Sequence, residues 1–212
     1  MKNKVCVVVG GSRGIGRAIA LRMARLGMQI AVLARNEAEL AALGQEVEAL
    51  GARYLPIQAD AADFEVLGRA FAQVWAALGG FDVLVNSAGT GVMTPFEELS
   101  QADIDATVDV NLKGTIYSVR QAVPWMAKNG GGNILNVSSM SAIRGIPDPV
   151  NCNGIYTATK FAVNGFTECM QKYLLKYNIR VTALCPGSTD TSWWTRWTHS
   201  FGTEAMLPAD TL

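Results

Sequence analysis

Charged residues are scarce in this chain, because only 17% of its 212 residues are Asp, Glu, Lys or Arg. The 18 basic residues balance the 18 acidic ones, so the net charge is zero and the sequence pI is about 6.6. A nucleic-acid or anionic-membrane surface needs concentrated positive charge, and we expect neither partner. Long hydrophobic runs are also lacking. The run Val5–Val9, which follows Lys2 and Lys4, is too short for a signal-peptide core or a membrane span, and it predicts a strand.

Metal-ligating residues are equally few. The chain has one histidine, His199, and four widely separated cysteines without a CxxC pair: Cys6, Cys152, Cys169 and Cys185. We therefore expect no metal site, and we interpret the cysteines as reduced thiols of a cytoplasmic protein.

Short apolar runs alternate with longer amphipathic segments along the chain, and half of all residues are hydrophobic. Strands are predicted at Val5–Val9, Ile30–Leu33, Tyr54–Gln58, Phe81–Val85, Ile134–Val137 and Arg180–Cys185. Helices are predicted at Arg17–Leu26, Glu37–Leu50, Phe64–Leu78 and Tyr156–Tyr177, and in a long stretch from the expected N-cap Ser100 towards Lys128. This order predicts a single α/β domain over residues 1–212, with a doubly wound parallel sheet that binds ligands at the C-terminal strand ends.

Glycine is over-represented, with 21 residues, and four glycines lie in the loop after the first predicted strand. Gly10, Gly14 and Gly16 form G-x-x-x-G-x-G at a strand-to-helix turn. Glycine permits positive φ angles and close backbone approach, so a phosphate can sit against the helix N-terminus. A P-loop is excluded, since Arg17-Ala18 stands where Lys-Ser/Thr is required.

The same loop also matches the nucleophile-elbow pattern G-x-S-x-G, centred on Ser12. In that interpretation Ser12 would be the nucleophile of a serine hydrolase, with His199 as its base and Asp190 as the orienting acid. A hydrolase elbow, however, follows a later central strand than the first one of the fold. We keep this as the weaker alternative.

The second predicted strand ends without a carboxylate, at Leu33-Ala34-Arg35-Asn36. Dinucleotide sites that bind a free ribose 2′-hydroxyl place an acid there. Arg35 can instead face a 2′-phosphate, and Arg13 in the glycine loop can hold its other side. These residues favour NADP(H) over NAD(H). Asp60, after the third strand, is placed to accept from an adenine amino group or simply to begin a helix.

Several short motifs follow successive predicted strands: Asn86-Ser87-Ala88-Gly89, Val110-Asn111-Leu112-Lys113-Gly114, Ser138-Ser139, Tyr156-x3-Lys160 and Pro186-Gly187. Together with the glycine loop, they make the chain resemble the short-chain dehydrogenase/reductase family over nearly its whole length. The resemblance implies a three-layer Rossmann-type sheet with strand order 3-2-1-4-5-6, and hydride transfer between NADP(H) and a carbonyl or secondary alcohol. It also implies a homodimer or homotetramer formed through the helices that carry Asn111 and Tyr156.

Tyr156 and Lys160 are four residues apart on a predicted helix, so their side chains share one face. A phenol pKa near 10 suits proton transfer at neutral pH poorly. We expect the neighbouring ammonium to favour the phenolate, so that Tyr156 acts as general acid or base while Lys160 also holds ribose hydroxyls. Ser139, preferred over Ser138 by the family pattern, would stabilise charge on the substrate oxygen.

The remaining assignments come from the resemblance. Asn111 would hold a water that connects Lys160 to solvent, and Asn86 and Gly89 would line the floor beneath the cofactor. Thr189 and Thr191 would contact the nicotinamide. The expected catalytic residues are Asn111, Ser139, Tyr156 and Lys160. The expected cofactor contacts are Gly10, Ser12, Arg13, Gly14, Ile15, Gly16, Arg35, Asp60, Ala61, Asn86, Ala88, Gly89, Tyr156, Lys160, Pro186, Gly187, Thr189 and Thr191.

Three features depart from the family pattern. Val9 replaces a frequent Thr, and the spacing between Ser139 and Tyr156 is lengthened by a Pro/Asn-rich loop over 146–154. The chain also ends where the family's last helix and seventh strand are expected, so that strand is predicted to be missing through truncation or in a short variant. Three tryptophans at 193, 194 and 197 suggest either an aromatic lid over an apolar or ring-containing substrate, or a helix packed on the core. An inactive dinucleotide-binding or sensor protein of the same fold remains the main alternative to an enzyme.

Overall fold

The computed structural model describes residues 1–145, 153–192 and 206–211. Its main sheet contains six parallel strands: β1 (Val5–Val9), β2 (Gln29–Ala34), β3 (Tyr54–Gln58), β4 (Val83–Asn86), β5 (Gly132–Val137) and β6 (Ile179–Leu184). The strand order is β3-β2-β1-β4-β5-β6, which confirms the predicted Rossmann-type sheet. The order reverses between β1 and β4, where the loops after neighbouring strands lead to opposite faces and leave room for a ligand.

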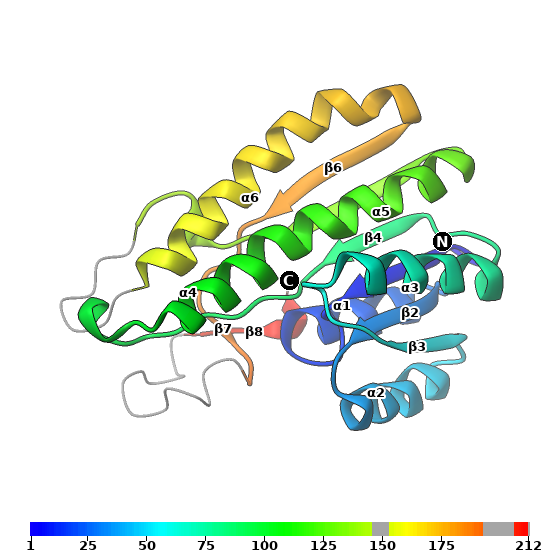
Figure 1. Cartoon of the computed structure of the whole chain (residues 1–212). Helices are drawn as coiled ribbons and strands as arrows, with labels where there is room; N and C mark the ends of the chain where they lie inside the picture. The colour runs from blue at the N-terminus through cyan, green and yellow to red at the C-terminus, as the bar shows by residue number, and fades with distance from the viewer. Residues whose placement is uncertain (146–152, 193–205, 212) are drawn as a thin grey trace.

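Helices cover both faces of this sheet and complete the three layers (Figure 1). They are α1 (Gly14–Arg25), α2 (Glu37–Ala49), α3 (Phe64–Leu78), α4 (Gln101–Val108), α5 (Gly114–Lys128) and α6 (Gly154–Tyr173). A π-helical segment, Asp109–Lys113, joins α4 to α5. Short 3-10 turns lie at Phe96–Glu98, Met140–Ala142, Leu174–Tyr177 and Ala209–Thr211.

Strand β1 shows why a continuous apolar run is needed in the middle of such a sheet. Successive side chains of a strand point to opposite faces. Val5, Val7 and Val9 accordingly pack in one core cluster with residues of α3 and α5. Cys6 and Val8 pack in the other with residues of α1 and α2. All five side chains are buried, and burial raises the pKa of the Cys6 thiol to about 12.

The ends of several helices follow from local sequence. Ser100 caps α4 in a reciprocal capping box with Asp103, as predicted. Asn36 caps α2 by accepting a hydrogen bond from the backbone N–H of Glu39, and Asp63 caps α3 in the same way. Gly79 ends α3 in the left-handed conformation that glycine tolerates. These caps hold the helices in place after strands β2 and β3.

In the described part of the chain the main sheet ends at β6, as the sequence predicts. The exposed positions of this edge strand are the polar residues Arg180 and Thr182, while Ile179 and Val181 are buried. Beyond β6, a two-residue strand β7 (Thr189–Asp190) pairs in parallel with β8 (Leu207–Pro208). The turn Ala209–Thr211 then packs against α1.

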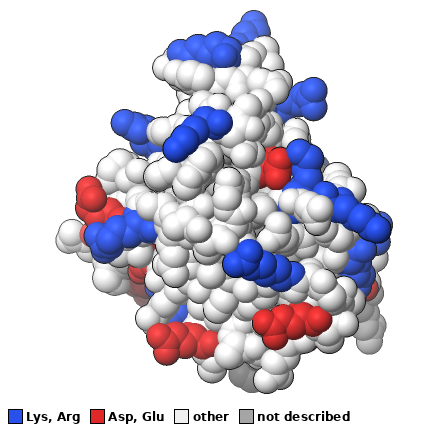
Figure 2. Space-filling model, turned by 90° about the vertical axis from the view of Figure 1, so that its right-hand side faces the viewer, with Lys and Arg blue, Asp and Glu red and all other residues white. Residues whose placement is uncertain are grey.

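Figure 2 shows the end of the molecule where the strands begin and several helices finish. Basic side chains occur in the last turns of three helices, with Arg22 and Arg25 in α1, Lys128 in α5 and Lys172 in α6. Positive charge there complements the negative end of a helix dipole. On the face shown, the charged side chains are scattered over a largely uncharged surface. None of the helices in the described ranges has the length and apolarity needed to cross a membrane.

Candidate functional site

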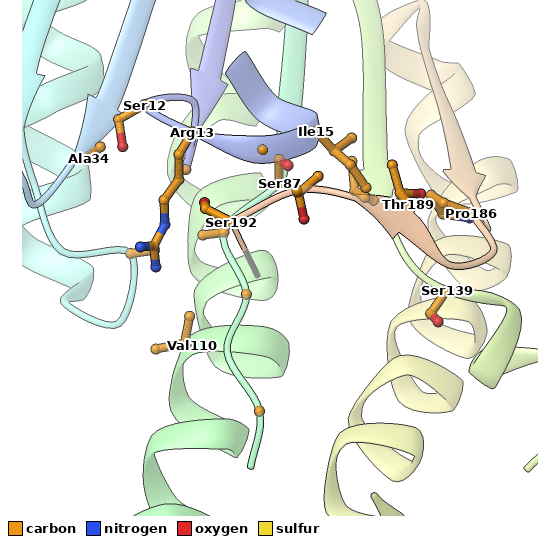
Figure 3. Close-up of a pocket in the computed structure, with 18 of the residues that line it drawn as sticks. Ser12, Arg13, Ile15, Ala34, Ser87, Val110, Ser139, Pro186, Thr189 and Ser192 are labelled. Carbon is orange, nitrogen blue, oxygen red and sulfur yellow. The ribbon is translucent and has the colours of Figure 1, made fainter. Parts of the chain in front are cut away.

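A cavity of about 1400 Å³ opens at the C-terminal ends of the parallel strands. Its wall is built from the loops that follow β1, β2, β3, β4, β5 and β6, because parallel strands end at one edge of the sheet. Figure 3 shows Ser12 and Arg13 at one end of this pocket and Ser139 at the other. The wall includes most residues expected from the sequence: Gly10, Ser12, Arg13, Gly14, Ile15, Arg35, Asp60, Ala61, Ala88, Gly89, Ser139, Tyr156, Lys160, Pro186, Gly187, Thr189 and Thr191.

The glycine loop passes so close to its neighbours that side chains would not fit. Gly10 has a φ of +78°, and an added Cβ would lie 2.4 Å from the Cα of Ala88. A Cβ on Gly16 would lie 2.4 Å from the carbonyl oxygen of Gly10. Gly16 itself is buried beneath the loop and is not among the residues that line the pocket, and its close approach to Gly10 is a packing requirement.

The first turn of α1 leaves its backbone N–H groups available to a ligand. The N-cap residue Arg13 makes no side-chain capping bond, and the first turn contains no acidic residue. Unpaired N–H groups and the helix dipole favour an anion at this position. The close-packed glycines and the uncapped helix start therefore fit the pyrophosphate of a dinucleotide.

Charged side chains at the same end of the pocket are paired. Arg13 Nη1 lies 4.0 Å from Glu39 Oε1, and Arg35 Nη1 lies 3.9 Å from Asp60 Oδ2. Ser12 Oγ donates a 2.6 Å hydrogen bond to Glu39 Oε2. The sequence prediction missed Glu39, although its place in the first turn of α2, directly after β2, could have indicated it. The described partner of Ser12 is thus a carboxylate, whereas the base proposed for a hydrolase, His199, lies outside the described residues.

The other end of the pocket brings Ser139, Tyr156 and Lys160 together. Ser139 follows β5, and its hydroxyl is hydrogen-bonded to that of Tyr156. The backbone N–H of Ser141 donates to Ser139 Oγ at 3.1 Å, which fixes the position of this hydroxyl. Ser138 turns elsewhere, because its hydroxyl donates to the carbonyl oxygen of Lys160 at 3.3 Å. This geometry supports the choice of Ser139 over Ser138.

Lys160 is buried beside Tyr156. Its Nζ donates to the carbonyl oxygen of Val137 at 2.9 Å and lies 5.6 Å from the centroid of the Tyr156 ring. Burial lowers the pKa of Lys160 to about 8, an effect partly offset by Cys185. Burial also raises the pKa of Tyr156, although the bond from Ser139 acts in the opposite direction. The expectation of a lowered Tyr156 pKa is therefore wrong for the protein without a ligand, since burial penalises the phenolate.

Asn111 lies in the π-helical segment and is buried behind the pocket. Its Oδ1 accepts from the backbone N–H of Thr90 at 2.7 Å, and its Nδ2 donates to the carbonyl oxygen of Thr90 at 2.8 Å. Nδ2 also lies 3.1 Å from Thr159 Oγ1 on α6. Asn111 thus clamps the segment after β4, and a Cβ on Gly89 would lie 3.5 Å from Asn111 Oδ1 and 3.8 Å from Lys160 Nζ.

Asn86 is buried and is not among the residues that line the pocket, and its side chain takes part in a buried hydrogen-bond network. Its Nδ2 donates to Asn136 Oδ1 at 2.8 Å, and its Oδ1 accepts from Ser118 Oγ. Asn136 Nδ2 in turn donates to Thr167 Oγ1 at 2.9 Å. This buried network joins β4, β5, α5 and α6 directly under the site.

Some predicted features fall outside the described residues. These are Cys152, most of the loop at 146–154, and the segment containing Trp193, Trp194, Trp197 and His199. Of the neighbouring described residues, Thr191 approaches the glycine loop, because a Cβ on Gly14 would lie 3.6 Å from its side chain. Among the described residues, no three His, Cys, Asp or Glu side chains are grouped so that they could hold a metal ion.

The fold and the site together define a Rossmann-type protein with a large pocket at the C-terminal strand ends and a Ser-Tyr-Lys cluster in that pocket. Residues 4–200 match the family model described as short chain dehydrogenase. The chain belongs to the short-chain dehydrogenase family of oxidoreductases.

Individual relatives agree with this assignment. An uncharacterized oxidoreductase from Staphylococcus epidermidis is 32% identical over 191 residues, which cover 90% of this chain and 80% of the relative. An alcohol dehydrogenase from the archaeon Thermococcus sibiricus, solved with 5-hydroxy-NADP, aligns with a TM-score of 0.88 at 29% identity, over 98% of this chain and 86% of that one. Carveol dehydrogenase from Mycobacterium avium, solved with NAD, aligns with a TM-score of 0.85 at 28% identity, over 92% and 74%.

Proposed function

We propose that the protein is an NADP(H)-dependent oxidoreductase that interconverts a carbonyl compound and a secondary alcohol. The observation that carries this proposal is the convergence of Ser139, Tyr156 and Lys160 on one pocket whose far end is an uncapped, glycine-lined helix start. The nicotinamide cofactor would supply or accept the hydride. The chain would supply the proton and hold the substrate oxygen.

In the reducing direction, the Tyr156 hydroxyl donates its proton to the substrate oxygen as negative charge develops there. Its raised pKa keeps Tyr156 protonated at neutral pH, which suits a general acid. Ser139 is held by the Ser141 N–H and donates a second hydrogen bond to the same oxygen. In the oxidising direction Tyr156 must first lose its proton to solvent, and its phenolate then accepts the alcohol proton.

Lys160 positions the cofactor and supplies positive charge. One of its N–H groups is directed to the carbonyl oxygen of Val137, which leaves two donors for ribose hydroxyls. Because the pKa of Lys160 is about 8, the ammonium form predominates at neutral pH. Asn111 holds the Thr90 backbone and Thr159 and so keeps the loop after β4 in place against α6.

The preference for NADP(H) rests on Arg13, Arg35 and Ala34. Both arginines line the pocket at the end where the ribose of the adenosine would lie, and β2 ends in Ala34 instead of a carboxylate. Arg35 remains largely exposed, so a 2′-phosphate can reach it. Asp60 Oδ1 accepts from the Ala62 N–H at 2.9 Å, and Oδ2 lies 3.9 Å from Arg35 Nη1, so an adenine amino group would bind Oδ2 beside this arginine.

The substrate proposed is apolar or ring-containing. Val92, Met93, Val110 and Met140 line the pocket and offer apolar surface, and Met140 directly follows Ser139. We further propose a reducing, cytoplasmic environment, since Cys6, Cys169 and Cys185 are free thiols.

A homodimer or homotetramer through the α5–α6 region is also part of the proposal. Support comes from large side chains that α6 and the following turn leave exposed, namely Phe161, Tyr173 and Leu175. Light scattering after size-exclusion chromatography measures the mass directly, and a monomer at micromolar concentration would contradict this part.

The function is tested with NADPH and a panel of aldehydes, ketones and sugars, using the wild type and Tyr156→Phe. We expect the wild type to oxidise NADPH with at least one substrate. We expect Tyr156→Phe to lose about 10²- to 10⁴-fold in rate, as for loss of a general acid, while it still quenches tryptophan fluorescence on binding NADPH.

Other outcomes separate the alternatives. A wild type that binds NADPH but turns over no substrate would identify a dinucleotide-binding or sensor protein. Labelling of Ser12 by a fluorophosphonate probe without nicotinamide binding would identify a hydrolase. A Tyr156→Phe variant as active as the wild type would exclude the assigned acid.

A further inference from the structure

Glu39 reaches the glycine loop from the first turn of α2. Ser12 Oγ donates to Glu39 Oε2 at 2.6 Å, and Arg13 Nη1 lies 4.0 Å from Glu39 Oε1. Ser12 and Arg13 both project into the pocket at this end (Figure 3). The two side chains of the loop that can bind an anion therefore already face one carboxylate.

The backbone holds this carboxylate in place. Strands β1 and β2 are paired up to Val9 and Leu33, so the loops that follow them emerge side by side. Asn36 caps α2 by accepting from the Glu39 N–H at 3.1 Å, which fixes the start of the helix. The Glu39 side chain is 32% exposed, so its charge is partly shielded from water and acts strongly on groups within the pocket.

Arg35 presents a different situation on the other side of the same pocket end. It pairs with Asp60 at 3.9 Å, and its side chain is 66% exposed. The Arg35–Asp60 pair includes no residue of the glycine loop. Each arginine thus faces a carboxylate. Of the two carboxylates, only that of Glu39 contacts both the Ser12 hydroxyl and the Arg13 guanidinium.

We propose that Glu39 is a specificity-determining residue, which lowers the affinity for a dinucleotide with a 2′-phosphate relative to one with a free 2′-hydroxyl. A 2′-phosphate must compete for Ser12 and Arg13, and its own negative charge is repelled by the carboxylate. A 2′-hydroxyl carries no charge and can donate a hydrogen bond to that carboxylate. The inference rests on the dinucleotide site of the proposed function. It predicts a preference for NADP(H) that is weaker than two arginines alone would produce.

The test is calorimetric titration of the full chain with NADP⁺ and NAD⁺, and with the fragments 2′,5′-ADP and 5′-AMP. Glu39→Gln keeps the size of the side chain and removes its charge. We expect the ratio of NADP⁺ to NAD⁺ affinity, and the ratio for the two fragments, to rise about tenfold. The matched control is Glu48→Gln, because Glu48 is exposed on the same helix, does not line the pocket, and its replacement changes the net charge equally. The control should change these ratios by less than about twofold.

The outcomes distinguish this inference from the proposed function. A wild type that binds neither dinucleotide overturns both. Binding of both dinucleotides with ratios unchanged or lowered in Glu39→Gln overturns only the role of Glu39. Equal effects of Glu39→Gln and Glu48→Gln would also overturn it, because they would show a general charge effect. Should Glu39→Gln fail to fold, Glu39→Asp provides the same test, since it keeps an acid at the helix start but withdraws it from Ser12.

Discussion

Lys160 Nζ lies 2.9 Å from the carbonyl oxygen of Val137, the last residue of β5, and this bond is buried. The ammonium therefore faces the sheet as well as the pocket. Burial lowers its pKa from 10.5 to about 8, because the charged ammonium is less well solvated inside the protein than in water. While Lys160 is protonated, this desolvation lowers the free energy of unfolding. The relationship makes Lys160 a source of pH-dependent stability.

We expect the stability of the wild type, relative to Lys160→Met, to increase between about pH 8 and pH 10.5. In that range the unfolded lysine still binds a proton while the folded one has lost it, so the free energy of unfolding rises with pH. A shift from 10.5 to about 8 corresponds to about 3 kcal/mol. Urea unfolding of both proteins across this range measures the effect. The comparison cancels the opposing contributions of other groups such as Cys6 and Tyr54, and parallel curves would show that Lys160 has an ordinary pKa.

Tyr156 should titrate above the ordinary tyrosine pKa of 10.0 in the protein without a ligand, because burial disfavours the phenolate. The measurement is the difference in phenolate absorbance between the wild type and Tyr156→Phe during an alkaline titration. A difference that develops below pH 10 would contradict the prediction. It would show that Lys160, 5.6 Å from the ring centroid, has a greater effect than burial.

Gly10→Ala should destabilise the protein and abolish dinucleotide binding. Its φ of +78° is unfavourable for alanine, and the new Cβ would meet the backbone of Ala88 at 2.4 Å. We expect a loss of about 3 kcal/mol or more in the free energy of unfolding. The control is Gly165→Ala in the exposed part of α6, where an added Cβ meets no atom within 4 Å. The free energy of unfolding of that variant should rise by about 0.5–1 kcal/mol, because alanine favours the helix over glycine. A Gly10→Ala variant as stable as the wild type would contradict the close packing of the glycine loop.

Arg35→Ala should weaken NADPH binding about tenfold and leave NADH binding almost unchanged, because only the phosphorylated cofactor meets the guanidinium. Fluorescence titration with each cofactor gives both constants. Equal losses for NADPH and NADH would indicate a general effect on the pocket, and no loss for either would remove Arg35 from the site. Together with Glu39→Gln, this variant would define the charges that set cofactor choice.

The sequence was sufficient for the sheet and for most of the pocket wall. Apolar runs predicted all six strands, and β1 and β3 have the predicted bounds. The predicted strand boundaries were less accurate where a residue is buried but does not pair with a neighbouring strand. Phe81, for example, was placed in a strand, but it is a buried residue that precedes β4. The stretch from Ser100 to Lys128 contains a π-helical segment at Asp109–Lys113, which hydrophobic periodicity does not reveal.

Within the site, the four-residue spacing predicted that Tyr156 and Lys160 share a helix face, and the family resemblance added Ser139; the structure places Ser139 after β5 and the other two near the start of α6. Other properties depend on tertiary contacts. The direction of the Tyr156 pKa shift follows from burial, and the inward position of Asn86 follows from its partners Asn136 and Ser118. The position of Glu39 directly after β2 could have placed it near the site, but its pairing with Ser12 joins residues 27 positions apart and follows only from the fold.

The buried network of Asn86, Ser118, Asn136 and Thr167 has a consequence for how the protein reaches its native state. Its members are 32, 50 and 31 residues apart along the three hydrogen bonds. Each bond closes a long loop, whose entropic cost must be met before the bond can form. The polar groups under the site are therefore expected to order late in folding, after strands β4 and β5 have paired. Amide protons beneath the pocket would then acquire their protection from solvent exchange among the last of the core.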